Sequence, residues 1–208
     1  NSVVAQTILE GVIKQTASFV NSRKGRLSVF WTDQILLLPT NHAPPASHVE
    51  ILTKGIAFPN ETDWQQQRLS SYGIFVKDEK EESYLLEKPT YAQFFQFANT
   101  LSKPQTALSL GCFTISNELL EVLIQEFQSD LKTKKSKMDV DKDWWMPSSL
   151  SWESYLSFIP EGKKQHYQRM QKLRNKMSNP FLSSYDFKDQ GFWWDLGTVQ
   201  NYYRNLLR

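Results

Sequence analysis

The sequence is poor in several features that would assign a chain quickly to a functional class. Its 208 residues include one cysteine, Cys112, and three histidines. A single cysteine excludes an intrachain disulfide framework and favours a reducing compartment, so we expect a cytoplasmic protein. Cys112 lies in an apolar run and is interpreted as a buried packing residue. His42, His48 and His166 have no cysteine or carboxylate at ligand spacing, which argues against a zinc site.

Charge and hydropathy exclude further classes. The net charge of +2 is too small to indicate nucleic acid or a membrane surface as a partner. No apolar run reaches the ~18 residues that a bilayer-spanning helix needs. Neither a Walker phosphate loop nor a Gly-x-Ser-x-Gly nucleophile motif is present. The composition is that of a globular protein, and the length fits one substantial domain or at most two small ones; we expect a single domain, residues 1–208.

Strand and helix patterns alternate along most of the chain, which predicts an α/β fold with a mainly parallel sheet. The pattern at 26–31 is typical of a strand buried on both faces. Residues 34–39 fit either a short strand or a helical turn. The expected strands are 26–31, 49–58, 72–78, 83–88, 106–116, 181–187 and 191–197, and the expected helices are 3–20, 90–101, 118–131, 163–177 and 198–208. We expect 72–78 and 83–88 to form a hairpin. Thr90, and either Ser116 or Asn117, are the expected N-caps of the helices that follow them.

Two acidic residues follow apolar strand patterns at opposite ends of the sequence. Asp33 comes directly after "RLSVFW", and ligands of open α/β sheets bind beyond the carboxyl ends of strands. Asp195 lies in "GFWWDLGT", where Gly197 permits a tight turn and Thr198 caps the helix that follows. Mg²⁺ is usually held by one or two carboxylates together with substrate phosphates, so both acids are candidate metal ligands. A turn or capping role is the alternative for each.

A third group of polar residues ends the strand pattern 83–88. Lys88 can reach a phosphate as a point charge, and Glu87 can accept hydrogen bonds from hydroxyl groups. The alternative is an exposed ion pair at a strand end. Within the strand pattern 106–116, Gly111 indicates a bulge or a close backbone approach.

Taken in order, "LSVFWTDQIL", "YGIFVKD…SYLLEKP", "ALSLGCFTIS" and "GFWWDLGTVQNYYRNLL" resemble motifs of the sugar-1-phosphate nucleotidylyltransferases (NDP-sugar pyrophosphorylases). The resemblance spans roughly residues 5–208, with an atypical insert or lid at 130–180. It implies a Rossmann-like mixed, mainly parallel sheet with helices on both faces. The family's N-terminal Gly-rich nucleotide loop is missing from the sequence, so we expect a fold that is incomplete at its N-terminus. A fragment of a longer chain explains this better than a degenerate relative.

The resemblance also implies a reaction and a set of site residues. A nucleotidyl group passes from a nucleoside triphosphate to a sugar-1-phosphate, pyrophosphate leaves, and Mg²⁺ is the cofactor. The implied roles are metal binding and catalysis by Asp33 and Asp195, catalysis by Lys88, and substrate binding by Gly73, Glu87 and Gly111.

Two other functions stay open. The first is a non-catalytic sugar-phosphate-binding or regulatory domain, which the missing loop favours. The second is a metal-dependent glycosyltransferase, which gives the Glu-Lys-Pro and Trp-x-Asp-x-Gly-Thr motifs no role. The expected partners are a nucleoside triphosphate and a sugar-1-phosphate, without nucleic acid or membrane; a homo-oligomer or additional domains in a longer chain are left open.

Overall fold

The computed structural model describes residues 26–39, 43–80, 82–126, 161–178, 180–188 and 190–206. The predicted helix at 3–20 and most of the predicted insert at 130–180 lie outside these ranges. The strands are β1 Arg26–Val29, β2 Gln34–Leu37, β3 Val49–Ile56, β4 Ile74–Lys77, β5 Ser83–Leu86, β6 Gln105–Ser116, β7 Leu182–Asp186 and β8 Phe192–Asp195. The helices are α2 Glu61–Gln66, the 3₁₀ helix η2 Leu69–Ser71, α3 Tyr91–Ala98, α4 Asn117–Glu126, α7 Glu161–Arg174 and α8 Val199–Leu206.

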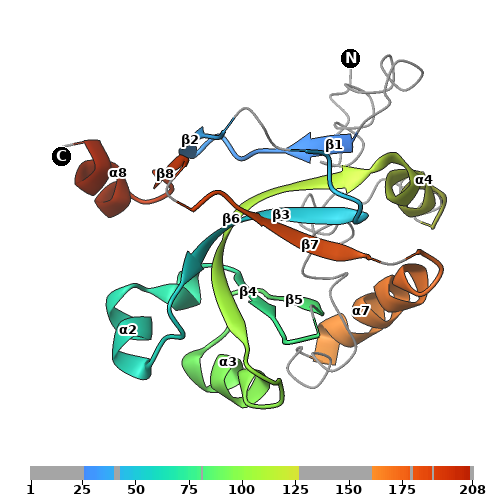
Figure 1. Cartoon of the computed structure of the whole chain (residues 1–208), viewed down its shortest axis with the longest axis horizontal. Coiled ribbons are helices and arrows are strands. Elements are labelled where there is room, and N and C mark those ends of the chain that lie inside the picture. Colours follow the sequence, from blue (N-terminus) through green and yellow to red (C-terminus); the bar gives the residue numbers. More distant parts are fainter. Residues whose placement is uncertain are drawn as a thin grey trace, which may run out of the picture. The chain divides into compact units, whose positions relative to one another are not determined.

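Most of the described strands belong to one mixed sheet (Figure 1). Its six strands run in the order β5-β4-β6-β3-β7, with β1 paired to β6, and β2 and β8 form a separate two-stranded sheet. Among the described strands, only the β3–β7 pair is parallel. The predicted Rossmann-like, mainly parallel sheet with helices on both faces is therefore wrong, because the observed sheet is mostly antiparallel.

The position of β4 explains much of this error. Helix α3 connects β5 to β6, and both of these strands pair antiparallel with β4. β5 and β6 therefore point the same way, as the alternation of strand and helix predicted. They are not neighbours, however, because β4 lies between them. A sequence pattern indicates the direction of successive strands better than their order in the sheet.

Several local predictions are confirmed. β4 and β5 form the expected antiparallel hairpin, with Ile74 opposite Leu86 and Lys77 opposite Ser83. Thr90 caps α3 in a reciprocal arrangement, since its hydroxyl accepts the Gln93 N–H and the Gln93 side chain accepts the Thr90 N–H. The segment 34–39 resolves to the strand alternative, as β2.

The chain divides into two compact units. In the first unit (1–27, 47–49 and 114–182), Leu119, Leu123 and Met170 are fully buried, and Arg169 of α7 forms an ion pair with Glu126 of α4 at 2.9 Å. The predicted strand 26–31 begins here as β1, but only Leu27 of β1 is buried, so the expectation of burial on both faces is wrong.

His48 of the first unit is a satisfied buried residue. Its Nδ1 lies 2.9 Å from Ser116 Oγ and its Nε2 lies 2.8 Å from Ser178 Oγ. The Ser116 hydroxyl also accepts the Leu119 N–H and so caps α4, as one of the two predicted caps. These contacts give the imidazole a structural role.

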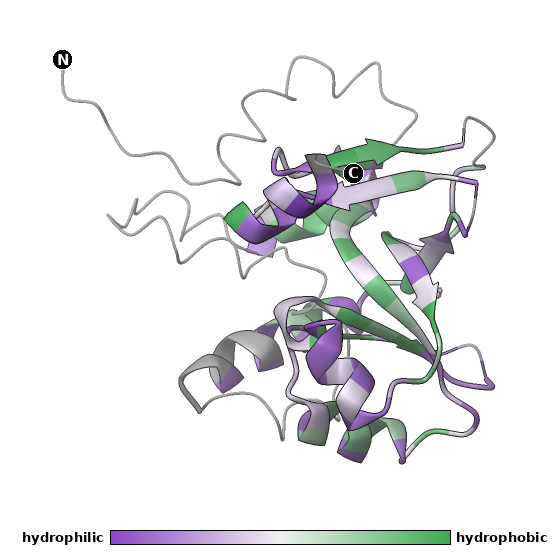
Figure 2. Ribbon diagram, turned by 90° about the vertical axis from the view of Figure 1, so that its left-hand side faces the viewer, coloured by the Kyte–Doolittle hydropathy of each residue, from purple (hydrophilic) through white to green (hydrophobic). Residues whose placement is uncertain are grey.

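The second unit (28–46, 50–113 and 183–208) has its core around β4 and α3. Ile74, Val76, Leu86 and Phe94 are each 0% exposed, and the Phe94 ring stacks on Trp64 at 4.8 Å. In Figure 2 the strands carry most of the hydrophobic colouring and the helices much of the hydrophilic colouring. Within the described part of the chain, no helix combines the length and the apolar character needed to cross a membrane.

Candidate functional site

The carboxylates of Asp33 and Asp195 converge on one point of the second unit, at Gly197. A Cβ atom added to Gly197 would lie 2.9 Å from Asp33 Oδ2 and 3.1 Å from Asp195 Oδ1. The missing side chain at position 197 thus leaves room for the two acids. Two carboxylates around one open point are a suitable pair of ligands for Mg²⁺, whose remaining positions go to water and substrate phosphates.

The pairing of β2 with β8 brings these acids together. The two strands are antiparallel, and Gln34 lies opposite Asp195. The ladder continues beyond this pair, because the Leu196 N–H donates to the Asp33 carbonyl at 2.8 Å. Asp33 and Asp195 therefore stand at the same end of the small sheet, although they lie at opposite ends of the sequence.

Neutral donors hold the Asp195 carboxylate in place. Its Oδ2 accepts hydrogen bonds from the Tyr72 hydroxyl and the Asn201 amide, each at 2.7 Å, and its Oδ1 accepts the Gly197 N–H at 2.8 Å. Burial, followed by the hydrogen bond to Asp195, raises the pKa of Tyr72 to about 12. Tyr72 therefore remains a neutral donor at physiological pH.

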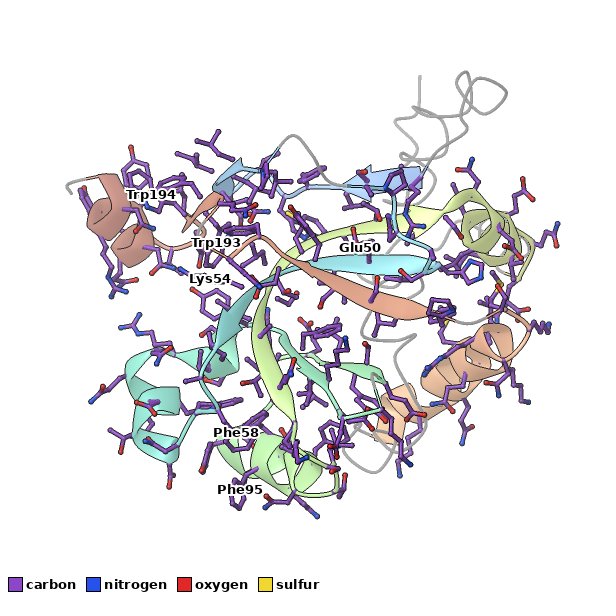
Figure 3. All side chains as sticks on the ribbon, viewed as in Figure 1. Glu50, Lys54, Phe58, Phe95, Trp193 and Trp194 are labelled. Carbon is purple, nitrogen blue, oxygen red and sulfur yellow. The ribbon has the colours of Figure 1, made fainter. Side chains whose placement is uncertain are left out.

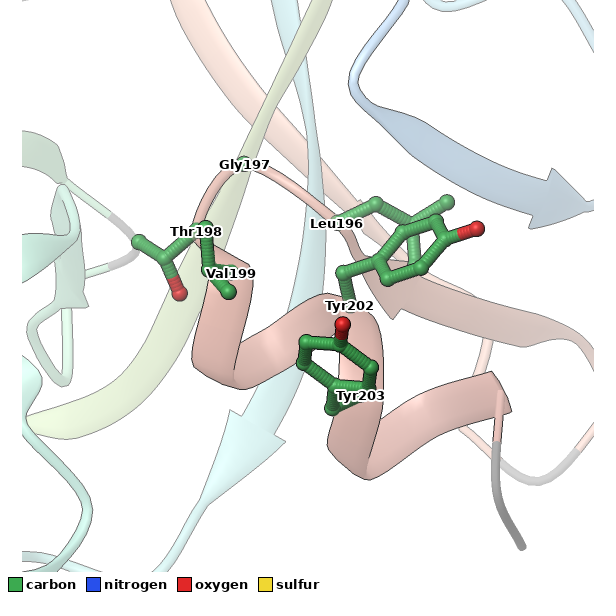
Figure 4. Close-up of a pocket in the computed structure, with 6 residues that line it drawn as sticks. All are labelled: Leu196, Gly197, Thr198, Val199, Tyr202 and Tyr203. Atoms are coloured by element: carbon green, nitrogen blue, oxygen red, sulfur yellow. The ribbon is translucent and has the colours of Figure 1, made fainter.

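Gly197, the point where the two carboxylates meet, also lines a shallow hollow at the start of α8 (Figure 4). Its volume is about 420 Å³, and it is lined by Leu196, Gly197, Thr198, Val199, Tyr202 and Tyr203. Thr198 caps the helix as predicted, since its hydroxyl accepts the Asn201 N–H at 3.1 Å. The other N–H groups of this first turn and the helix dipole favour a negatively charged group in the hollow.

Gly73 and Glu87 lie near each other, and Gly73 directly follows Tyr72, the tyrosine that donates to Asp195. A Cβ at Gly73 would lie 3.5 Å from Glu87 Oε2 and 3.2 Å from Ser109 Cβ. The Gly73 carbonyl also accepts the Ser109 N–H at 2.8 Å. These contacts link two of the predicted substrate-binding residues to each other and, through Tyr72, to Asp195.

Gly111 supports the segment that carries Asp33. Its φ of +76° is in the left-handed region, and an added Cβ would lie 3.1 Å from the Trp31 ring. The Trp31 indole donates to the Gly111 carbonyl at 2.9 Å. The group that approaches Gly111 is therefore the Trp31 side chain of this chain.

Lys88 has a less direct relation to the site. Its side chain is exposed, and its φ of 45° is unusual for a residue with a side chain. Among the described residues, no hydrogen bond or ion pair joins Lys88 to Asp33 or Asp195. Its predicted contact with a phosphate therefore depends on the substrate.

A small polar network connects the two-stranded sheet to β6. Gln34 donates to Cys112 Sγ at 2.7 Å and accepts the Trp193 indole N–H at 2.7 Å. Cys112 is fully buried, and burial raises the pKa of its thiol. The interpretation of Cys112 as a buried packing residue agrees with this environment.

Sequence reasoning missed the residues that orient Asp195. Tyr72 precedes a predicted substrate-binding glycine, and Asn201 occupies the third position of α8, where a side chain can reach back to the helix start. These sequence positions are the features from which the roles of Tyr72 and Asn201 could have been predicted. Trp31 gave no such signal, because its contact with Gly111 depends on the tertiary fold.

The described residues hold no cluster of three or more histidine, cysteine or acidic side chains suited to a metal. Two carboxylates alone fit a weakly held Mg²⁺ that arrives with a phosphate substrate better than a closed structural metal site. Comparison of the chain with protein-family models and with curated proteins finds no match. The nucleotidylyltransferase resemblance accordingly remains a prediction.

Proposed function

We propose that this chain carries a Mg²⁺-dependent site for transfer of a nucleotidyl group from a nucleoside triphosphate to a sugar-1-phosphate. The observation that carries the proposal is the meeting of the Asp33 and Asp195 carboxylates at Gly197. The four motifs of the resemblance support it, because they contain Asp33 and Asp195. They also contain Gly73, Gly111 and Gly197, the glycines whose close contacts are described above. The proposal needs no parallel sheet, since it rests on the site alone.

In the proposed reaction, an oxygen of the sugar-1-phosphate forms a bond to the α-phosphorus of the nucleoside triphosphate. The bond from that phosphorus to the pyrophosphate oxygen breaks, and pyrophosphate leaves with both bonding electrons. Asp33 and Asp195 would hold Mg²⁺, which supplies neutralisation of the phosphate charge when bound. Such chemistry depends mainly on positioning and on charge stabilisation.

The chain's other residues have supporting roles in this proposal. Tyr72 and Asn201 fix the Asp195 carboxylate, so less reorganisation is needed when the substrates bind. The first turn of α8 offers N–H groups to a phosphate oxygen. Lys88 orients the sugar phosphate from its exposed position, and Glu87 accepts hydrogen bonds from sugar hydroxyls near Gly73 and Gly111.

The proposal is tested by incubating the full chain with Mg²⁺, each of the four nucleoside triphosphates and a panel of sugar-1-phosphates, and by measuring pyrophosphate release. Asp33→Asn and Asp195→Asn should each lower turnover at least about 100-fold, the usual effect of removing a group that stabilises transition-state charge. Glu121→Gln, which changes an exposed acid of α4, is the matched control. Loss of activity that only follows loss of thermal stability would count against the metal assignment, as would full activity in both asparagine variants.

The second candidate is a non-catalytic sugar-phosphate-binding domain. Three neutral donors already occupy the Asp195 carboxylate, which is also how a purely structural acid at a helix start would be bonded. Calorimetry distinguishes the two. The binding domain predicts a sugar-1-phosphate signal that is independent of Mg²⁺ and no metal-dependent affinity for a nucleoside triphosphate.

A further inference from the structure

The second unit contains another cavity, which shares no lining residue with the hollow at Gly197. It is formed by residues from β3, β4, β6 and β7 and from the segments that follow or precede these strands, and its volume is about 490 Å³. Small-molecule sites commonly measure about 300–1,000 Å³ and combine apolar walls with a few polar groups. The cavity has both the size and the mixed lining of such a site.

Thr53 of β3 is the first sign that something binds there. It lines the cavity and is 0% exposed, yet its hydroxyl oxygen has no hydrogen-bond partner in the described part of the chain. Buried hydroxyl groups in folded proteins nearly always have a partner. A partner supplied from the cavity accounts for this one.

Asp186 provides a fixed negative charge in the cavity wall. Its Oδ2 accepts the Gly55 N–H at 3.2 Å, and its Oδ1 accepts the Lys188 N–H at 2.9 Å. A Cβ at Gly55 would lie 2.7 Å from Oδ2, so glycine is what allows the carboxylate to approach β3 this closely. Each oxygen keeps a further lone pair for an amino group of a ligand.

The remaining walls offer a ring surface and positive charge. Phe58 is 44% exposed, and one side of its ring packs against Phe94 at 5.3 Å. Phe58 lies beyond the end of β3, next to α3 (Figure 3). Lys77 and Lys188 also line the cavity. Aromatic surface, a carboxylate and ammonium groups thus line one hollow.

We propose that this cavity binds a small zwitterion that carries a ring, the chemical class of the aromatic amino acids. The ligand's ammonium group binds Asp186, its carboxylate binds Lys188 and the Thr53 hydroxyl, and its ring packs on Phe58. A ligand that is only acidic or only basic would bind either the lysines or Asp186 of the cavity wall, but not both. The proposal is independent of nucleotidyl transfer, because none of these residues takes part in the site at Gly197.

Calorimetry of the full chain with L-phenylalanine, L-tyrosine and L-tryptophan tests the ligand class. At least one of them should bind with a Kd of about 1 mM or tighter. Phenethylamine lacks the carboxylate and 3-phenylpropionate lacks the ammonium group, so both should bind at least about tenfold more weakly, because each loses a charge-assisted hydrogen bond. Absence of binding by all three amino acids, or equal binding by a truncated compound, overturns the proposal.

Variants test the site. Thr53→Val keeps the shape of the side chain and removes the unpaired hydroxyl, so it should leave the Tm of the free protein unchanged or raised and weaken the amino acid about tenfold. Asp186→Asn and Lys188→Ala should weaken it by a similar factor. Lys54→Ala is the matched control, since Lys54 is exposed, neighbours Thr53 on β3 and does not line the cavity (Figure 3). If Thr53→Val lowers the Tm and leaves the Kd unchanged, the hydroxyl serves the fold and the proposal is wrong.

Discussion

Two strand pairs of the second unit have the same size and the same pairing but different surroundings. β4–β5 and β2–β8 each consist of four-residue strands in antiparallel register. In β4–β5, Ile74, Val76 and Leu86 are each 0% exposed. In β2–β8, by contrast, Ile35 is 38% and Leu37 is 64% exposed. Burial of apolar surface therefore stabilises the first pair far more than the second.

The second pair depends on polar contacts instead. The Trp193 indole binds Gln34, the Leu196 N–H binds the Asp33 carbonyl, and Asn205 of α8 binds the Asp195 carbonyl at 2.9 Å. The candidate site stands at the end of this pair. Sites that must admit a ligand are usually drawn from such less stable parts of a protein, while the buried pair maintains the fold.

The largest expected effect comes from breaking the buried pair. Leu86→Ala should lower the free energy of unfolding by about 2–5 kcal/mol, because it removes a fully buried side chain and leaves a cavity. Urea denaturation followed by tryptophan fluorescence measures this loss. A change below about 1 kcal/mol would mean that burial in β4–β5 is not what stabilises the second unit.

The contrast between the pairs also shows what the sequence could predict about the fold. The hairpin β4–β5, the Thr90 cap and the start of α8 depend on residues close together in the sequence, and all were predicted correctly. The pairing of β4 with β6 and of β2 with β8 depends on tertiary packing. Local patterns carry little information about it, which is why the predicted parallel sheet was wrong.

The candidate site was predictable to a similar extent. Asp33, Glu87 and Asp195 were selected because each follows a strand pattern in an order that resembles a known family. Their hydrogen-bond partners were not selected, since Tyr72 and Asn201 bind Asp195 only after β2, β8 and α8 are in place. Lys88 was selected for its chemistry, and whether it reaches a phosphate remains a prediction.

A second, intermediate effect is expected at Tyr72, where burial and a carboxylate act on one hydroxyl. The pKa of Tyr72 is raised from 10.0 to about 12, so folding favours its neutral form. The resulting stabilisation is fully present below pH 10 and is lost as the pH rises towards 12. Tyr72→Phe should cost about 1 kcal/mol at neutral pH, since the side chain is half-buried and solvent screens the interaction.

Urea denaturation of the wild type and of Tyr72→Phe at neutral pH and between pH 10 and 12 measures both parts of this prediction. The difference between the two proteins should shrink over the alkaline range. Tyr203→Phe is the control, because Tyr203 is 58% exposed and its replacement should change neither value. A difference that stays constant up to pH 12 would mean that the hydroxyl does not donate to Asp195.

The smallest effect is expected in the exposed pair, at Leu37. Like Leu86, Leu37 is a leucine in a four-residue strand. Leu37→Ala should change the free energy of unfolding by less than about 0.5 kcal/mol, as is usual for surface substitutions. The same denaturation measurement applies to both leucines, so the ratio of their effects tests the comparison directly. A loss of 2 kcal/mol or more at Leu37, on the scale of about 2–5 kcal/mol for a buried leucine, would mean that this face of β2 is covered in solution. The polar contacts around Gln34 and Asp195 would then not suffice to explain how the candidate site is held.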